Sequence, residues 1–231
     1  MTLFSADATQ CIETVQPEET SLEATNQVPV IVSTARPEVT LGKQLKKLIV
    51  GDSILQGLLH IKNTTTVCLS GATISSVQDY INKHQQFVMD FDVIVFHIGT
   101  NNVGNYQPVH NILDSYTNLY YCTREVNDNA VIVFSAMIPR AGDEEPNLAI
   151  CNINSSLQEL CHNIWRSPFL RIFTQFRCGN FIRNEFYRFN SGYPGLHLND
   201  FGSRRLTQYF RAQLSDKNIA IILDKIQRYI R

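Results

Sequence analysis

The sequence lacks the long apolar run that a membrane-spanning helix requires, since none of its apolar stretches approaches about 18 residues. Its amino terminus has neither the basic residues nor the extended apolar core of a secretory signal. These two absences argue against an integral membrane protein and against a secreted one. We therefore expect an intracellular, cytoplasmic location, with peripheral contact to a membrane surface left open.

Metal-binding patterns are also absent from the sequence. The cysteines form no CxxC pair, and no cysteine–histidine cluster has the close spacing of a zinc site. We predict reduced, mostly buried thiols, with neither a metal nor a cofactor. The cysteines are Cys11, Cys68, Cys122, Cys151, Cys161 and Cys178.

The sequence has little net charge, formally −1 at pH 7. A chain this close to neutrality creates no strong field that would attract or repel nucleic acid. The basic residues between positions 204 and 231 are interspersed with an apolar stripe, a pattern more typical of two solvated helix faces than of a nucleic-acid site. The sequence therefore carries no strong signal for a nucleic-acid partner.

Residues 1–41 differ in composition from the rest of the chain. They are rich in Thr, Glu, Pro, Ser and Ala, and their scattered large apolar side chains are too few to offset the entropy of ordering. They carry six acidic residues and one basic residue, which leaves 15 acidic and 19 basic residues for positions 42–231. We expect an acidic, flexible leader over residues 1–41 and one domain over residues 42–231.

From residue 45 onward, short apolar runs alternate with longer amphipathic segments. The runs predict strands over residues 45–50, 66–69, 92–98, 130–135 and 169–173. The amphipathic segments predict helices over residues 75–89, 109–126, 147–165, 201–214 and 217–231. Strands that alternate with helices in this way form right-handed crossovers and a parallel sheet. The expected fold class is α/β: a three-layer, flavodoxin-like, doubly wound parallel sheet of about five strands with helices on both faces.

Polar residues and glycines follow the predicted strands, where the carboxyl ends of parallel strands meet at one edge. Ser53 follows the first strand in GDS, Gly71 the second in LSGATI, and Asn101 the third in HIGTNN. His197, in GLHLND, precedes the helix expected from residue 201. A serine, a histidine base and preorganised N–H donors are what acyl transfer requires. Each residue alone has an ordinary explanation in a turn, a loop or a helix cap, so the prediction depends on the set.

These four blocks, in this order, resemble those of the SGNH, or GDSL-like, hydrolase family. The resemblance covers about residues 46–214 and implies an ester hydrolase in which Ser53 is the nucleophile and His197 the general base. It also implies an oxyanion hole made by the backbone N–H groups of Ser53 and Gly71 and by the Asn101 side-chain amide.

Two further features extend the resemblance. The SAMIPR segment, residues 135–140, lies where this family often has a Ser-Pro-Arg segment, and Asp52 would shape the turn without transferring a proton. GTNN and GLHLN are similar to the esterase domain in the first open reading frame of CR1- and L2-type retrotransposons, which suggests a retrotransposon-derived protein.

The sequence departs from the family pattern at Pro194, where the family usually has an aspartate that orients the histidine. Loss of that acid costs about 10⁴-fold in turnover in other triads. The cost falls if a backbone carbonyl, of Tyr193 or Pro194, fixes the histidine tautomer. Two hypotheses stay open: a serine esterase that acts on small acyl or lipid esters, and a catalytically degenerate module that serves binding.

An aromatic stretch, with Tyr187, Phe189 and Tyr193, precedes His197. These side chains could line an acyl or lipid pocket beside the histidine, or could anchor an irregular segment to the core. Aromatic side chains in an irregular segment more often anchor it to the core. The sequence predicts no oligomeric state.

Overall fold

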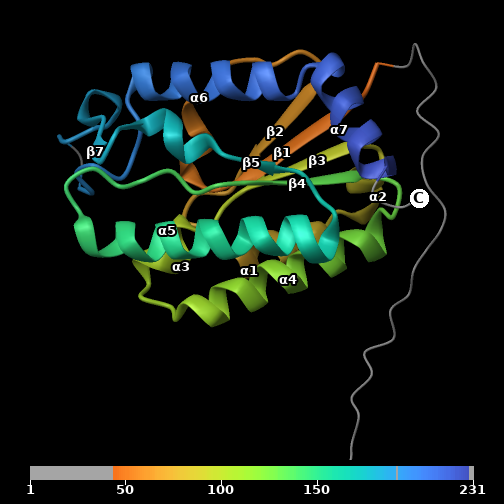
Figure 1. The fold of residues 1–231 in the computed structure, drawn as a ribbon, viewed down its shortest axis with the longest axis horizontal. Helices are drawn as coiled ribbons and strands as arrows, with labels where there is room; N and C mark the ends of the chain where they lie inside the picture. The colour runs from red at the N-terminus through yellow and green to blue at the C-terminus, as the bar shows by residue number, and fades with distance from the viewer. Residues whose placement is uncertain (1–43, 191, 229–231) are drawn as a thin grey trace, which may run out of the picture. The chain divides into compact units, whose positions relative to one another are not determined.

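Five parallel strands form the central sheet, in the order β2-β1-β3-β4-β5 (Figure 1). The computed structural model describes residues 44–190 and 192–228, so the predicted leader over residues 1–41 lies outside the described residues. The strands are β1 (Lys47–Gly51), β2 (Thr64–Cys68), β3 (Val93–His97), β4 (Val131–Ser135) and β5 (Phe169–Leu170). This is the strand order of flavodoxin-like sheets, and it confirms the predicted fold class.

Helices cover both faces of this sheet. In Figure 1, α1, α4 and α5 lie below the sheet and α6 and α7 lie above it. The helices are α1 (Ile74–Lys83), α2 (Gln85–Met89), α3 (Thr100–Gly104), α4 (Val109–Val126), α5 (Glu144–Glu159), α6 (Asp200–Gln213) and α7 (Asp216–Arg228). Shorter pieces are the 3-10 helices η1 (Ser53–Gly57), η3 (Ile172–Phe176) and η4 (Asn184–Phe186), the π-helical η2 (Leu160–Trp165) and a hairpin of β6 (Arg177–Cys178) and β7 (Phe181–Ile182).

The strands supply two cores because successive side chains point to opposite faces. Leu48 and Val50 of β1 join the core beneath α1, α4 and α5, whereas Ile49 joins the core beneath α6 and α7. Phe96 and Phe134, on neighbouring strands, have ring centroids 5.5 Å apart in the first core. Each such side chain contributes about 1.5–3 kcal/mol when it is fully buried.

The structure differs from the predicted elements in three places. The helix expected over residues 75–89 breaks at His84, whose backbone (φ −120°, ψ 38°) is not helical, so α1 and α2 are separate. The strand expected over residues 169–173 ends at Leu170 and continues as η3. The helix expected over residues 147–165 begins at Glu144, and its last turn widens into η2. In each place the apolar spacing fits both the predicted element and the observed one, so the spacing alone does not fix where an element ends.

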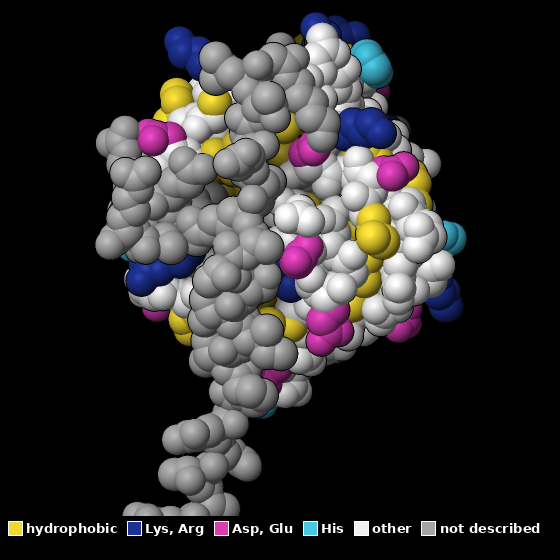
Figure 2. All heavy atoms as spheres, turned by 90° about the vertical axis from the view of Figure 1, so that its right-hand side faces the viewer, with side chains coloured by type: hydrophobic (Ala, Val, Ile, Leu, Met, Phe, Trp, Pro, Cys, Tyr) yellow, Lys and Arg dark blue, Asp and Glu magenta, His cyan; other side chains and the backbone are white. Residues whose placement is uncertain are grey.

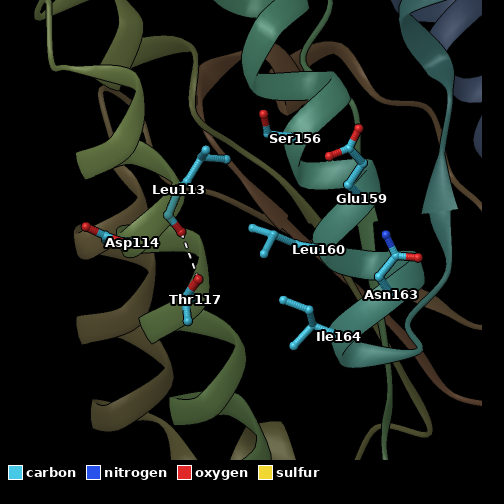
Figure 3. Close-up of a pocket in the computed structure, with 8 residues that line it drawn as sticks. All are labelled: Leu113, Asp114, Thr117, Ser156, Glu159, Leu160, Asn163 and Ile164. Carbon is cyan, nitrogen blue, oxygen red and sulfur yellow. Dashed lines mark hydrogen bonds between the residues drawn. The ribbon is translucent and has the colours of Figure 1, made fainter. Parts of the chain in front are cut away.

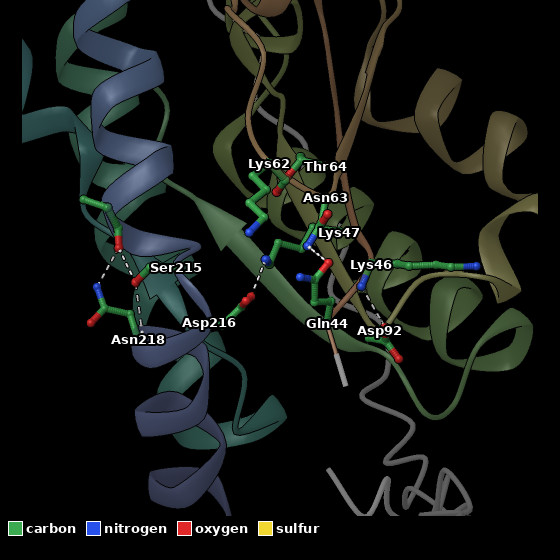
Figure 4. A network of polar contacts seen from close by, with 11 residues as sticks. Gln44, Lys46, Lys47, Lys62, Asn63, Thr64, Asp92, Ser215, Asp216 and Asn218 are labelled. Carbon is green, nitrogen blue, oxygen red and sulfur yellow. Dashed lines mark hydrogen bonds and ion pairs between the residues drawn. The ribbon is translucent and has the colours of Figure 1, made fainter. Parts of the chain in front are cut away.

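A polar network ties α7 to the amino-terminal end of the sheet (Figure 4). The ammonium of Lys47, on β1, donates to Asp216 Oδ1 at 2.6 Å, and the Lys47 side chain is 4% exposed. Asp92 Oδ2 accepts a hydrogen bond from the Lys46 N–H at 2.8 Å. The buried ammonium thus has a charged partner at the first turn of α7.

The end of the molecule seen in Figure 2 carries charges of both signs. Lys and Arg side chains are interspersed there with Asp and Glu, outside the area drawn in grey. This mixed surface agrees with the near-zero net charge. Among the described residues, no helix is long and apolar enough to cross a membrane.

Candidate active site

The carboxyl ends of β1, β2 and β3 lie in register at one edge of the sheet. Gly51, the last residue of β1, pairs with Cys68 of β2 on one side and with His97 of β3 on the other. A Cβ atom at Gly51 would lie 2.0 Å from the His97 carbonyl oxygen, so only glycine fits there. The chain reverses its winding direction between β1 and β3, and ligands bind at such switch points in open α/β sheets.

Ser53 begins η1 directly after this switch point. Asp52 caps η1: its Oδ1 accepts the Ile54 N–H at 3.0 Å, and its carbonyl accepts the Leu55 N–H at 3.0 Å. The Asp52 side chain is 1% exposed, and its Oδ2 has no hydrogen-bond partner among the described residues. Burial raises the pKa of Asp52 to about 6, against the Ile54 hydrogen bond and the Arg140 charge, which lower it. Asp52 therefore shapes the serine turn, as the sequence predicts.

The structure joins the loops that carry Gly71 and Asn101. The Asn101 side-chain amide donates to the carbonyl of Ala72, next to Gly71, at 2.8 Å. Gly71 has φ +70°, in the left-handed region that favours glycine. The Asn101 Nδ2 group has two hydrogens, so one remains available to a ligand.

The Asn101 loop is held from two more sides. Gly99 has φ +117°, and a Cβ there would lie 2.4 Å from the Tyr116 hydroxyl oxygen, which donates to the Ile98 carbonyl at 2.5 Å. Asn102 Oδ1 accepts the Ile74 N–H, at the start of α1, at 3.0 Å. The sequence marks GTNN as a site block, but it does not identify Tyr116 as the side chain that fixes the loop.

His197 lies between an irregular loop and α6. Its carbonyl accepts the Arg188 N–H at 2.8 Å, and its ring meets the Tyr193 ring edge-to-face with centroids 6.5 Å apart. Burial and the positive charge of Arg188 lower the pKa of His197 below its usual 6.5. A histidine that is neutral at pH 7 is suited to accept a proton.

Helix α6, which follows His197, packs against η1, which begins with Ser53. A Cβ at Gly57, the last residue of η1, would lie 2.2 Å from Ser203 Oγ on α6. Nearby, the Leu59 N–H donates to Thr207 Oγ1 at 3.1 Å. The structure thus brings the two elements together, although no hydrogen bond joins the Ser53 hydroxyl to the His197 ring among the described residues.

Pro194 leaves His197 without the usual acid. Pro194 is exposed, and the charged neighbour that shifts the pKa of His197 is the cationic Arg188. Among the described residues, no hydrogen bond holds the His197 ring, and the Tyr193 carbonyl accepts from the Leu196 N–H at 3.3 Å.

Asn199, and not Asp200, caps α6. Asn199 Oδ1 accepts the Gly202 N–H at 3.0 Å, so Asp200 lies within the first turn of the helix. Asn199 Nδ2 also donates to the carbonyls of Glu185 and Tyr187, at 2.8 and 3.1 Å. These bonds fix the loop before His197, and Tyr187 is a buried anchor of that loop, 3% exposed.

Described residues line several shallow surface regions, and two of these grooves are compared with the site. One, of about 390 Å³, begins at Gly71 and runs along α1 past Asp79, Tyr80 and Lys83. The other, of about 330 Å³, lies between α4 and the α5–η2 segment and contains no predicted site residue (Figure 3). The groove at Gly71 is therefore the one that adjoins the candidate site.

No protein-family model and no curated protein matches the sequence, but solved structures do match the fold. A G-D-S-L family lipolytic protein from Veillonella parvula superposes with a TM-score of 0.60 at 13% identity, over 75% of this chain and 100% of that one. The fold is that of the GDSL lipolytic proteins.

Two more structures share this GDSL fold. A Streptococcus pneumoniae protein that its description links to platelet activating factor gives a TM-score of 0.61 at 22% identity, over 77% of this chain and 87% of that one. A GDSL-like lipase from Bacteroides thetaiotaomicron gives 0.60 at 12% identity, over 73% and 86%. Identities this low establish the fold, while the chemistry must be argued from the site.

Proposed function

We propose that this chain is a serine ester hydrolase of the SGNH type. Ser53 is the nucleophile and His197 the base, and the N–H groups of Ser53 and Gly71 form the oxyanion hole with the Asn101 amide. The observation that supports the proposal is the hydrogen bond from the Asn101 amide to the Ala72 carbonyl. It joins the loops after β2 and β3, the two strands that pair with β1, and β1 leads to Ser53.

The proposed reaction has two steps: acylation of Ser53 and hydrolysis of the acyl-serine. His197 takes the Ser53 hydroxyl proton while Oγ attacks the ester carbonyl, and the negative charge develops on the carbonyl oxygen before the three N–H donors. The imidazolium then returns the proton to the departing alkoxide, which leaves as the alcohol. Water repeats the sequence on the acyl-serine, so that the acid is released and Ser53 is restored.

Because Pro194 stands where the family has an acid, we expect slow ester hydrolysis. Without an acid on His197, the imidazolium lacks a charged partner, and turnover is expected about 10⁴-fold below that of a full triad. Substrates with good leaving groups depend least on proton return. Activated short acyl esters are therefore the first substrates to test. Lipid esters are the second.

The test is hydrolysis of p-nitrophenyl acetate by the purified chain, by Ser53→Ala and by His197→Ala. We expect turnover in the unsubstituted protein and loss to background in both variants. Ser156→Ala is the matched control because Ser156 lines the groove between α4 and α5, away from the proposed residues. Turnover that persists in Ser53→Ala would refute the proposal.

A second candidate is a binding module that keeps the fold without the chemistry. The specific observation in its favour is that His197 has a cationic neighbour, Arg188, and a proline where the acid would stand. A retrotransposon origin would fit either candidate. Absence of turnover on both acetyl and longer acyl esters, in protein shown to be folded, would favour this candidate.

A further inference from the structure

The segment Pro139–Ala141, after β4, is hydrogen-bonded to the loop that leads to His197. The Tyr187 hydroxyl donates to the Pro139 carbonyl at 2.5 Å, and the Ala141 N–H donates to the Gly195 carbonyl at 2.9 Å. A Cβ at Gly195 would lie 1.9 Å from the Ala141 carbonyl oxygen, so the two backbones are in close contact. The residue between these two contacts is Arg140.

The backbone of Arg140 is clamped on both sides by Asn147, in α5. Asn147 Oδ1 accepts the Arg140 N–H at 2.8 Å, and its Nδ2 donates to the Arg140 carbonyl at 2.7 Å. The side chain of Arg140 therefore starts from a fixed point. Because the Arg140 backbone is held in place, the guanidinium can occupy only a limited set of positions.

The guanidinium of Arg140 packs against both ends of α3, the element that carries Asn101. Its Nη2 donates to the Thr100 carbonyl at 2.6 Å. A Cβ at Gly104 would lie 2.7 Å from the same Nη2, so the guanidinium is seated directly on the helix end. Asn101, next to Thr100, is thus positioned partly by Arg140.

The charge of Arg140 acts on the turn that carries Ser53. It lowers the pKa of Asp52, the buried residue next to Ser53, against the larger effect of burial. Asp52 Oδ2 and Arg140 Nε are both buried without a hydrogen-bond partner among the described residues. The Asp52 carboxylate and the Arg140 guanidinium, on which the Asp143 charge also acts, have opposite charges and attract one another in this buried setting.

We propose that Arg140 is a positioning residue that holds the Asn101 loop and the Ser53 turn in their mutual arrangement, through the Thr100 carbonyl and the Asp52 carboxylate. This inference rests on the proposed ester hydrolysis. A group that only orients oxyanion donors acts after substrate has bound, so its loss lowers kcat more than it raises KM.

The experiment measures kcat and KM for p-nitrophenyl acetate in Arg140→Met. We expect kcat to fall about 10- to 100-fold, because small displacements of catalytic groups have effects of this size. KM should change by less than about threefold, because ground-state binding is not the function assigned to Arg140. Arg140→Gln, which keeps a donor for the Thr100 carbonyl, repeats the measurement if Arg140→Met does not fold.

Two comparisons separate positioning from a general structural role. Arg177→Met is the matched control: its Nε is also buried without a partner among the described residues, and its Nη2 donates to the Asn180 carbonyl at 2.9 Å. We expect its kcat to stay within about twofold of the unsubstituted protein. In an Asp52→Asn background, Arg140→Met should have a smaller effect on kcat, because one of its two partners has lost its charge.

The outcomes distinguish this inference from the proposed function. An unchanged kcat in an active protein, a loss confined to KM, or an undiminished effect in the Asp52→Asn background would each overturn the role of Arg140 alone. If the unsubstituted protein neither hydrolyses the ester nor reacts at Ser53 with a fluorophosphonate, the proposed function fails, and this role fails with it.

Discussion

Two titratable side chains are buried beside the site, and burial shifts them in opposite directions. Asp52 is 1% exposed and has a pKa raised to about 6, whereas His97 is 2% exposed and has a pKa lowered to about 4. In both cases burial favours the neutral form. The sequence indicates that Asp52 shapes a turn. It does not predict that Asp52 and His97 are buried, because their burial depends on which helix covers the strand end.

Asp52→Asn tests the burial of this carboxyl. The folded-state pKa of Asp52 is raised, so its contribution to stability is fully present below pH 3.8 and is lost as the pH rises through about 6. The free energy of unfolding of Asp52→Asn, relative to the unsubstituted protein, should therefore increase between pH 4 and pH 8, by up to about 3 kcal/mol. Urea unfolding at several pH values measures this. A difference independent of pH would contradict the shift.

His97 gives the opposite pH dependence. Its Nδ1 lies 3.1 Å from Ser135 Oγ, and its ring meets Phe210 edge-to-face. The lowered pKa means that its contribution is present above pH 6.5 and is lost as the pH falls toward about 4. His97→Gln should consequently lose less stability than the unsubstituted protein between pH 6.5 and pH 4. The exposed His110→Gln serves as control, and equal acid sensitivity of the two variants would refute the prediction.

At the scale of elements, the strands and long helices follow from apolar periodicity, whereas the short elements that carry the site do not. Strands β1, β3 and β4 were predictable because each is a run of buried residues that are mostly apolar. Strand β2 contains three threonines and no fully buried residue, and it covers Thr64–Cys68 where the prediction was residues 66–69. Helices η1 and α3 have five residues each, too few to show a period, and they depend on Asp52, Gly99 and Arg140 for their shape. The sequence therefore identifies Ser53 and Asn101 as candidates without showing what holds them.

Gly57→Ala tests the contact between η1 and α6. The added Cβ would lie 2.2 Å from Ser203 Oγ, so the two elements must separate. We expect a loss of about 1–3 kcal/mol in unfolding free energy, together with slower ester hydrolysis. Ser203→Gly in the same chain removes the obstruction and should restore part of the rate. Gly192→Ala, where nothing lies within 4 Å of the new Cβ, should behave like the unsubstituted protein.

At the scale of the whole molecule, the proposed catalytic residues lie toward one end of the sheet and the Lys47–Asp216 ion pair lies at the other. The fold class could be predicted because strands and helices alternate, and the positions of Ser53, Gly71 and Asn101 just after β1, β2 and β3 follow from the same pattern. The contacts of Arg140 with Thr100 and of Ala141 with Gly195 could not, because they join segments 40 or more residues apart. Local sequence patterns do not predict contacts between residues so far apart in the chain.

Asp216→Ala tests the ion pair at the opposite end of the sheet. Lys47 is 3% exposed, so removal of Asp216 leaves a buried ammonium without its charged partner. We expect a loss of about 2–3 kcal/mol in the free energy of unfolding with kcat nearly unchanged. Lys47→Met with Asp216→Ala should recover much of the stability, since no buried charge remains. A large loss of kcat would contradict this separation of the two ends.

The most direct test of the central claim is the rate at which a fluorophosphonate labels Ser53 as a function of pH. If Ser53 and His197 act together, labelling should rise with pH through a pKa below 6.5, reach a plateau near pH 7 and fall to background in His197→Ala. Labelling of the same rate and pH dependence in His197→Ala, or no labelling of the folded unsubstituted protein, would contradict it.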